Sequence, residues 1–518
     1  MEKQTVIGYL VKKNEYYDSV FLMRVAKNLS EQEGILDAVV LMGTEKNKEL
    51  LADFGAGAEE VSSATPNDLI LALKAESRQA LTSALGDIDQ WLHPAAAGGS
   101  TFAVRTLDEA LARQPHSNLA VISVPGAYAA REAKKALESG LNVFLFSDNV
   151  PIESERSLKE YARERGLIVM GPDCGTALIA GIGFGFANVV RRGPIGVIGA
   201  SGSGIQEFST LVHRNGSGIS HAIGTGSRDL SDSVGGISAL AALDGLEADR
   251  QTQVIAIISK PPGALALANL VPRILQCPKP VITCFLGFEE NHLPAAMRNR
   301  TARTLNEAAA LSIEIAIGKQ PPYFKLDSAR FQELIHRERE GMKPEQQYIR
   351  GVFAGGTFCY QAQQVLLEAG IVAHSNAPLQ GNVKLQDCLR SAEHTLVDMG
   401  SDEFTVGRPH PMIDSSLRRE RILAEAEDPE VMILLLDFVL GFNSSPDPAG
   451  ELAPSIAAAQ RAAKKRGGSL SVVASVCGTE EDPQDFQQQV KRLKDAGVVV
   501  FPSGAEAAQF CARLAAGS

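Results

Sequence analysis

A chain of 518 residues is too long for a single hydrophobic core, so its length favours about three domains. Hydrophobic residues make up 45% of the chain and charged residues 21%, which excludes a wholly disordered protein. The formal net charge of −11 gives no electrostatic basis for binding nucleic acid, and no apolar run is long enough to cross a membrane. The amino terminus has no signal-peptide core, and the seven cysteines never form a Cys-x-x-Cys pair. We therefore expect a cytoplasmic protein with no metal site and with no membrane or nucleic-acid partner.

Apolar runs alternate with helical patterns along most of the chain, beginning in residues 1–190. Three of these runs are typical of strands in a parallel sheet covered by helices on both faces: Leu119–Val124, Leu141–Phe146 and Leu167–Met170. Residues 55–117 break the pattern because they are rich in alanine and serine, and we expect a helical insertion there that ends in a flexible loop at residues 94–100. The sequence thus predicts a Rossmann-like, doubly wound α/β domain over residues 1–190, with an insertion at 55–117.

An internal repeat follows this first domain. Two glycine-rich turns, at Gly199–Gly204 and Ala354–Thr357, each follow an apolar run and lead into a helical pattern. Each repeat continues with two further strand-like runs and ends in a helix that contains Glu-Ala-Ala. We therefore predict two flavodoxin-like domains with doubly wound parallel sheets, at residues 191–325 and 348–518, joined by a linker at residues 326–347.

The two glycine turns are candidate phosphate-binding sites. The first N–H groups of a helix point at one place, and the helix dipole favours an anion there. The residues that would bind the anion are Ser201, Gly202, Ser203, Gly204, Gly355, Gly356 and Thr357. A glycine turn also serves the tight packing of a strand against a helix, and one turn alone does not separate these interpretations. Two equivalent turns favour anion binding, because two repeated domains can face each other and hold one anion between them.

Charged residues after strand-like runs, together with one polar loop, are further candidates. Lys260 either neutralises a phosphate or is a solvated strand end. Arg228 either grips a carboxylate or phosphate or forms a surface pair with Asp229. His410 stands between two prolines in the loop 400–414 and is either functional or packed. The candidates for substrate loops are Asp229, Arg408, Asp414, Gly478 and Thr479, and the last two also fit a capped turn.

On these residues the chain resembles the succinyl-CoA synthetase superfamily and, most closely, its FdrA/YahF branch of acyl-CoA synthetase-like proteins. Gly171–Gly175 and Val124–Gly126 resemble stretches of the synthetase α subunit, and the turn at Gly199–Gly204 resembles the start of its glycine-led helix. Ala354–Thr357 is similar to the matching start in the carboxyl domain of the β subunit. The resemblance covers nearly the whole chain. It implies that residues 1–190 are a domain of the CoA-binding type, with a degenerate CoA-type site at Pro125, Asn149 and Pro172.

The sequence departs from the synthetases at three points. The glycine loop that wraps the CoA diphosphate is replaced by Lys12–Ser19. The loop with the phosphorylated histidine is missing, since only His292 lies in a shortened segment, and Lys260 aligns with the glutamate that holds the phosphohistidine. No ATP-grasp domain is recognisable in these residues. These departures imply no certain cofactor, and they predict that CoA is bound weakly or not at all.

The resemblance to the FdrA branch implies an enzyme, one subunit of a carbamoyltransferase of the oxamate type. Such an enzyme exchanges carbamoyl phosphate and oxamate for oxalurate and phosphate in purine and allantoin catabolism. Lys260, Arg228 and His410 are then the catalytic candidates. The expected partners are a small acyl or carbamoyl phosphate and, in a hetero-oligomer, other transferase subunits. Two alternatives stay open: an acyl-CoA synthetase of the succinate–CoA ligase type, and a regulatory protein that only binds an anionic metabolite.

Overall fold

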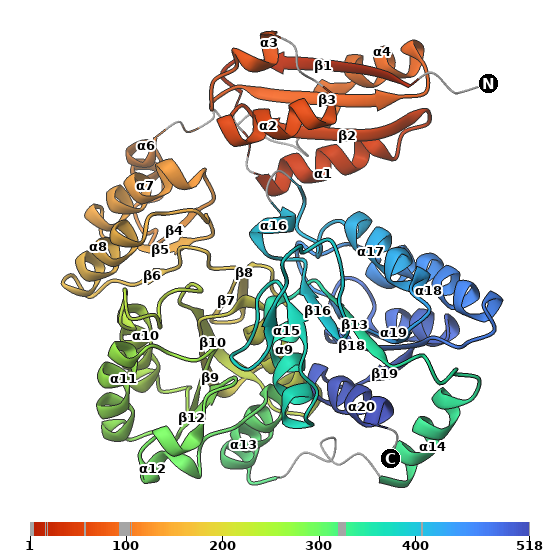
Figure 1. Ribbon diagram of the computed structural model, residues 1–518. Helices are drawn as coiled ribbons and strands as arrows, with labels where there is room; N and C mark the ends of the chain where they lie inside the picture. The colour runs from red at the N-terminus through yellow and green to blue at the C-terminus, as the bar shows by residue number, and fades with distance from the viewer. Residues whose placement is uncertain are drawn as a thin grey trace. The chain divides into compact units, whose positions relative to one another are not determined.

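The computed structural model describes the chain apart from residues 1–4, 16, 18, 56–58, 93–103, 105, 320–327, 406–407 and 517–518. The loop expected at residues 94–100 and residues 326–327 of the predicted linker lie outside the described residues. By its internal contacts the chain divides into two units, whose elements are labelled in Figure 1. The first unit comprises residues 1–116 and 402–414, and the second comprises residues 117–401 and 415–518.

The first unit is built on an antiparallel sheet in the strand order β1-β3-β2. Its strands are β1 (Val6–Lys12), β2 (Ile35–Met42) and β3 (Leu69–Ala75). Its helices are α1 (Ser19–Ser30), α2 (Glu45–Phe54), α3 (Glu59–Ser62), α4 (Arg78–Gly86), α5 (Ile88–Leu92), α6 (Leu107–Arg113) and α16 (Asp402–Thr405). Alternate residues of β3 face the two sides of the sheet. Leu71 and Leu73 pack with α1 and α4, whereas Ile70 and Ala72 pack with α2 and α3.

This antiparallel sheet corrects two expectations. Residues 1–190 are not a single Rossmann-like domain, and residues 55–117 are not a helical insertion. The central strand β3 lies inside the expected insertion and pairs with β1 on one side and β2 on the other. Leucine and alanine favour a helix in isolation, but β3 has only seven residues, and all of them except Lys74 are buried. Burial on both faces of the sheet overrides the helical propensity of this segment.

The second unit begins with a small parallel sheet in the order β4-β5-β6. Its elements are β4 (Leu119–Ile122), α7 (Gly126–Glu138), β5 (Asn142–Leu145), α8 (Ile152–Arg163) and β6 (Val169–Met170). The three apolar runs predicted as strands between residues 119 and 170 are therefore strands.

A six-stranded sheet follows, in the order β12-β11-β9-β10-β7-β8. Its strands are β7 (Thr176–Ile179), β8 (Ile182–Gly185), β9 (Arg192–Gly199), β10 (Ile219–Gly224), β11 (Val254–Ser259) and β12 (Val281–Phe285). Its helices are α9 (Gly202–Arg214), α10 (Ile237–Ala248), α11 (Ala264–Gln276), η1 (Glu290–His292), α12 (Ala295–Arg298) and α13 (Leu305–Ile317). β9 to β12 are parallel, and two separate hydrophobic clusters, one with α9 and α13 and one with α10 and α11, cover the two faces.

The second repeat forms a seven-stranded parallel sheet in the order β15-β14-β16-β13-β17-β18-β19. Its strands are β13 (Tyr348–Phe353), β14 (His374–Ser375), β15 (Val383–Lys384), β16 (Thr395–Asp398), β17 (Val431–Val439), β18 (Ser471–Cys477) and β19 (Val499–Phe501). Its helices are α14 (Ser328–Arg339), α15 (Gly356–Glu368), α17 (Ser416–Glu427), α18 (Pro448–Lys465), α19 (Phe486–Asp495) and α20 (Gly504–Ala516). The α/β class with doubly wound parallel sheets is thereby confirmed, while the domain boundaries at 191–325, 326–347 and 348–518 remain predictions.

The two helices that follow the glycine turns lie together within the second unit. Figure 1 shows α9 and α15 between the sheet that carries β9 to β12 and the sheet that carries β13 to β19, and the two helices contact each other. Within the described ranges, no helix has both the length and the apolar character needed to cross a lipid bilayer.

Candidate functional site

The two glycine turns meet at the start of α9 and α15. The hydroxyl groups of Ser201 and Thr357 are in hydrogen-bond contact, and the Thr357 N–H donates to Ser203 Oγ over 3.4 Å. A Cβ placed on Gly355 would lie only 3.0 Å from the Cβ of Ser203. The structure thus brings together all seven residues that the sequence singled out for anion binding. We call Ser201–Gly204 and Gly355–Thr357 the paired-turn site.

Backbone donors converge at this site. Ser201 caps α9, since its Oγ accepts the Gly204 N–H over 3.2 Å. In the part of the chain that the structure describes, the N–H groups of Gly202, Ser203 and Gly356 donate no hydrogen bond. These three residues are half-buried. The arrangement therefore presents N–H groups and two positive helix ends to one small region, which is the chemistry of an anion site.

A buried ion pair shapes the second turn. The N–H groups of Ala354 and Gly355 donate to the two carboxylate oxygens of Asp437, each over 2.8 Å. Arg418 lies 2.9 Å from the same carboxylate and also donates to the carbonyl of Val352. The Gly355 N–H is therefore occupied by Asp437 and does not point to a ligand, contrary to its expected role in binding phosphate.

Neither Asp437 nor Arg418 was identified from the sequence. The available signal was the single charge that interrupts the apolar strand β17 near its carboxyl end. Charged side chains are rarely buried unless they are paired, so an aspartate in such a strand indicates a buried partner.

A second carboxylate stands against the paired-turn site. A Cβ on Gly356 would lie 2.5 Å from Oδ2 of Asp398, the last residue of β16, whose Oδ1 accepts the Gly400 N–H over 2.9 Å. Burial and then the Asp398 charge raise the pKa of the Cys359 thiol, which excludes Cys359 as a nucleophile at neutral pH. Sequence reasoning missed Asp398. The signal was an acid at the carboxyl end of a buried strand, where doubly wound sheets place their ligands.

Lys260 follows β11, as expected, and its side chain is exposed. Its Nζ lies 5.2 Å from the ring centroid of Tyr360, in the second turn of α15, and its charge acts to lower the pKa of Cys359. Burial raises the pKa of Tyr360 to about 12, so this ring stays neutral. Lys260 therefore stands beside the second turn of α15, where its ammonium group faces the Tyr360 ring.

Arg228 and Asp229 take part in an ion-pair network and not in the paired-turn site. Arg228 pairs with Glu155 of α8 over 2.8 Å, and Lys159 lies 2.8 Å from both Glu155 and Asp229. Asp229 also accepts the backbone N–H groups of Ser238 and Ala239 in the first turn of α10. The surface pair between Arg228 and Asp229, one of the two alternatives left open by the sequence, is therefore replaced by contacts with α8. These contacts join the start of the second unit to the first repeat.

Gly478 and Thr479 form a capped turn after β18. The Thr479 N–H donates to Asp482 over 2.8 Å, and its hydroxyl donates to the carbonyl of Val189 over 2.7 Å. Asp482 also accepts the Val189 N–H over 2.7 Å. This turn ties the second repeat to the segment that precedes β9, in agreement with the capped-turn interpretation.

The predicted CoA-type site lies at one edge of the small parallel sheet. Pro125 caps α7, and a Cβ on Gly126 would lie 2.4 Å from the carbonyl oxygen of Asp148, so this turn packs against the loop that carries Asn149. The loop with Pro172 joins them, because the Asp173 N–H donates to the carbonyl of Ser147 over 2.9 Å. The structure therefore brings Pro125, Asn149 and Pro172 to neighbouring loops.

Three candidates belong to the first unit: Arg408, His410 and Asp414. His410 Nδ1 accepts the Met412 N–H over 3.2 Å, and the His410 carbonyl accepts the N–H groups of Ile413 and Asp414. His410 thus stabilises a tight turn in that unit, whereas the paired-turn site lies entirely within the second unit.

Equivalent side chains of α9 and α15 cap helices of the opposite repeat. Glu207 Oε1 accepts the Gly504 N–H at the start of α20 over 2.8 Å, and Gln361 Oε1 accepts the Leu305 N–H at the start of α13 over 2.8 Å. Glu207 and Gln361 each stand five positions after the first glycine of their helix. This reciprocal capping fixes the two turns relative to each other.

Burial raises the pKa of Glu207 to about 7 and that of Glu506 of α20 to about 7. Such carboxyl groups bind protons more tightly in the folded chain than in the unfolded chain, where the value is about 4.5. Their contribution to stability is therefore complete below about pH 4.5 and is lost as the pH rises through about 7. Glu207→Gln keeps the acceptor for Gly504 but cannot ionise. We expect the free energy of unfolding of the variant, measured against wild type, to be roughly 3 kcal/mol higher at pH 8 than at pH 4.5.

Urea unfolding followed by circular dichroism across this pH range measures the difference. Glu420→Gln is the matched control, because Glu420 is exposed on α17. An unchanged pH dependence in Glu207→Gln would show that Glu207 is ionised in the folded chain near pH 7.

Family models match three parts of the chain. A "CoA-ligase" model matches residues 352–514, a "CoA binding domain" model matches residues 190–270, and a model for "AllF, heavy metal-associated domain" matches residues 5–106. The CoA-binding match includes the first turn of the paired-turn site and begins after the predicted CoA-type site at residues 125–172. The described residues hold no group of three or more His, Cys, Asp or Glu side chains that is arranged to bind a metal.

The "uncharacterized protein YahF" of Escherichia coli K12 is 42% identical to this chain over 500 residues, which is 96% of each chain. The chain belongs to the FdrA/YahF family. This YahF-family chain is also 26% identical over 224 residues to the succinate–CoA ligase α subunit of Methanothermobacter thermautotrophicus, covering 42% of the chain and 75% of the relative. It carries CoA-binding and CoA-ligase domains, and so has the scaffold of an acyl-CoA ligase.

A solved structure of ATP citrate lyase from Methanothrix soehngenii, in complex with citrate and coenzyme A, matches with a TM-score of 0.36 and 17% sequence identity. That match covers 44% of the YahF-family chain, and the chain spans less than half of the lyase, 45% of its length.

Proposed function

We propose that this chain is a subunit of a carbamoyltransferase of the oxamate type and that the paired-turn site binds the phosphate of carbamoyl phosphate. The observation that carries the proposal is the contact between two helix N-termini at Ser201, Ser203 and Thr357. Each helix end favours an anion, and two ends that face the same region favour it more strongly than one. Lys260, beside the second turn of α15, adds a positive charge on this side.

The transfer needs stabilisation of a leaving phosphate and a place for one proton. The nitrogen of the acceptor attacks the carbamoyl carbon, so a C–N bond forms while the C–O bond to phosphate breaks. Phosphate leaves with the electron pair of that bond and is stabilised by the N–H groups of the two turns and by Lys260. Asp398, whose carboxylate lies against Gly356, is the group that accepts the proton of the acceptor nitrogen.

The segment between β12 and α13 supports a preformed acyl phosphate over a phosphohistidine. His292 stands in the short helix η1, its side chain is 64% exposed, and it contacts Phe288 and Glu289. A lysine at the end of β11 attracts an anion, whereas a glutamate there suits the orientation of a charged histidine. The proposal therefore assigns phosphate binding, and not phosphoryl relay, to this chain, with the remaining catalytic parts supplied by other subunits in a hetero-oligomer.

The test is oxalurate formation from carbamoyl phosphate and oxamate by the chain purified together with its partner subunits. We expect Lys260→Met to lower the transfer rate or the phosphate affinity about ten- to a hundredfold, because one charge-assisted contact is lost. Lys260→Glu should lower the transfer rate or the phosphate affinity further than Lys260→Met does, because the glutamate also repels the anion. If the wild-type complex forms oxalurate and both variants keep its kinetics, Lys260 is a solvated strand end. If the wild-type complex forms no oxalurate, the proposed function is wrong.

The matches to CoA-binding and CoA-ligase domains favour a second candidate, an acyl-CoA ligase related to the succinate–CoA ligases. The same preparation separates the two functions. A ligase would incorporate acid-labile phosphate from γ-labelled ATP and bind CoA, whereas a carbamoyltransferase subunit would do neither. Labelling of the purified chain would replace the transferase proposal with the ligase.

A further inference from the structure

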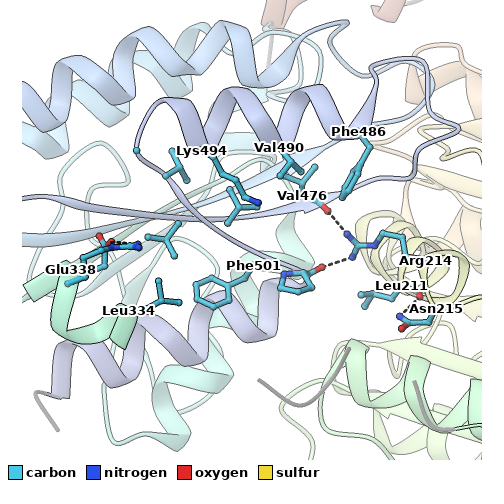
Figure 2. A pocket seen from close by; sticks show the side chains of 16 residues that line it. Leu211, Arg214, Asn215, Leu334, Glu338, Val476, Phe486, Val490, Lys494 and Phe501 are labelled. Carbon is cyan, nitrogen blue, oxygen red and sulfur yellow. Dashed lines mark hydrogen bonds and ion pairs between the residues drawn. The ribbon is translucent and has the colours of Figure 1, made fainter. Parts of the chain in front are cut away.

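A cavity of about 730 Å³ opens within the second unit, at the far end of α9 from the paired-turn site (Figure 2). Leu211, Arg214 and Asn215, from the carboxyl end of α9, line one side. The helix has 13 residues between Gly202 and Arg214, so at 1.5 Å per residue its ends are about 18 Å apart. The cavity is therefore separate from the paired-turn site.

The interior of the cavity is largely apolar. Leu334 of α14, Val490 of α19 and Phe501 at the end of β19 face it from three elements (Figure 2). The wall formed by α14 is fixed, because Phe331 contacts the rings of Phe501 and Phe510 at centroid distances of 5.8 and 5.7 Å. A space of this volume with apolar walls is within the usual size range for sites that bind small organic molecules.

The charges at the cavity are mostly positive. Its lining holds three cationic side chains, Arg214, Arg337 and Lys494, and one carboxylate, Glu338. The carboxylate of Glu338 forms an ion pair with Arg337 over 2.9 Å and accepts a hydrogen bond from the Ser471 hydroxyl over 2.8 Å. This excess of positive charge stands out in a chain with a net charge of −11.

Arg214 and Arg337 have partners within the protein, whereas Lys494 forms no ion pair among the described residues. Arg214 donates to the carbonyls of Val476 and Pro502, so it holds the wall in place. Among the described residues, no acidic side chain forms an ion pair with Lys494, which extends from α19 toward the side where Phe501 lies (Figure 2). The cavity thus combines an apolar interior with one available ammonium group.

We propose that this cavity binds a small organic anion with an apolar body, such as an aromatic or aliphatic carboxylate. Its hydrocarbon part lies between Leu334, Val490 and Phe501, and its carboxylate pairs with Lys494. A neutral molecule of the same shape lacks the ion pair, and a small ion such as acetate lacks the apolar contact. Both parts are therefore needed for binding.

The probe is 4-(trifluoromethyl)benzoate, titrated with the full-length chain and followed by ¹⁹F NMR. We expect saturable binding at one site per chain, with the neutral 4-(trifluoromethyl)benzamide bound at least about tenfold more weakly. Lys494→Glu should weaken the benzoate at least about tenfold, and Val490→Trp should abolish its binding because the indole fills the space. Lys464→Glu on α18 is the matched control, since it changes the net charge equally at an exposed position that does not line the cavity, and it should leave binding unchanged.

Three results would overturn the proposal. The first is no saturable binding of the benzoate to the wild-type chain at millimolar concentration. The second is equal affinity for the benzoate and the benzamide. The third is wild-type affinity for the benzoate in a Lys494→Glu variant that circular dichroism shows to be folded. This test remains valid even if Val490→Trp fails to fold, because Lys494 is exposed and its substitution leaves the core unchanged.

Discussion

Asp437→Ala is expected to lower the free energy of unfolding of the second unit by about 3–5 kcal/mol. The substitution leaves the buried guanidinium of Arg418 without its carboxylate, and a buried charge without a partner is costly. It also leaves the N–H groups of Ala354 and Gly355 without their acceptors, so the second glycine turn loses the contacts that hold its shape. Urea unfolding followed by circular dichroism measures the loss.

The exposed ion pair between Lys491 and Asp495 gives the matched control for this loss. It has a similar separation of 2.7 Å, but its side chains are 74% and 62% exposed. Asp495→Ala should therefore cost less than about 0.5 kcal/mol. The double variant Arg418→Met/Asp437→Leu should recover part of the lost stability, because it removes both buried charges together. Equal stability of Asp437→Ala and Asp495→Ala would mean that the buried pair contributes nothing.

The repeated architecture could be predicted because its signals are local. An apolar run followed by a glycine turn and an amphipathic stretch describes a strand, a turn and a helix within about twenty residues, whatever surrounds them. Lys260 after β11 and the two turns at Ser201 and Gly356 were found in this way. The repeat made it possible for the two turns to face each other, since each stands at the same place in its own sheet, but their contact depends on how the two sheets pack.

The partners of buried charges could not be predicted, because they depend on segments far apart in the sequence. Arg228 was weighed against its neighbour Asp229, yet it pairs with Glu155 of α8, and Asp229 pairs with Lys159. The strand β3 was missed for a related reason. Its leucines and alanines favour a helix locally, and only the pairing with β1 and β2 decides the outcome.

Asp398 is the residue of the candidate site that sequence reasoning should have found. It ends a short strand of otherwise uncharged residues, and such strand ends border ligand sites in parallel sheets. Its place against Gly356 also explains why a glycine begins α15, since any side chain there would meet the carboxylate.

Gly356→Ala is accordingly expected to lower the affinity for phosphate about a hundredfold. The added Cβ would lie 2.5 Å from Asp398 Oδ2. Because this carboxylate is buried and accepts the Gly400 N–H, we expect the first turn of α15 and the end of β16 to move apart rather than the carboxylate to rotate. That movement carries the Thr357 N–H away from Ser203 and disrupts the paired-turn site. A misplacement of about 1 Å in a binding site lowers a reaction rate about a hundredfold, and we expect a loss of the same order in phosphate affinity. Isothermal titration with inorganic phosphate measures the affinity.

Gly245→Ala is the matched control, because nothing lies within 4 Å of a Cβ at that position in α10. It should leave phosphate binding unchanged and stabilise the helix by about 0.5–1 kcal/mol. A double-mutant cycle with Asp398→Ala tests whether the clash with Asp398 causes the loss of phosphate affinity. If the clash with Asp398 is what disturbs the turn, Gly356→Ala should cost much less affinity in the Asp398→Ala background than in the wild type. Wild-type affinity in Gly356→Ala itself would mean that phosphate does not bind between the two turns.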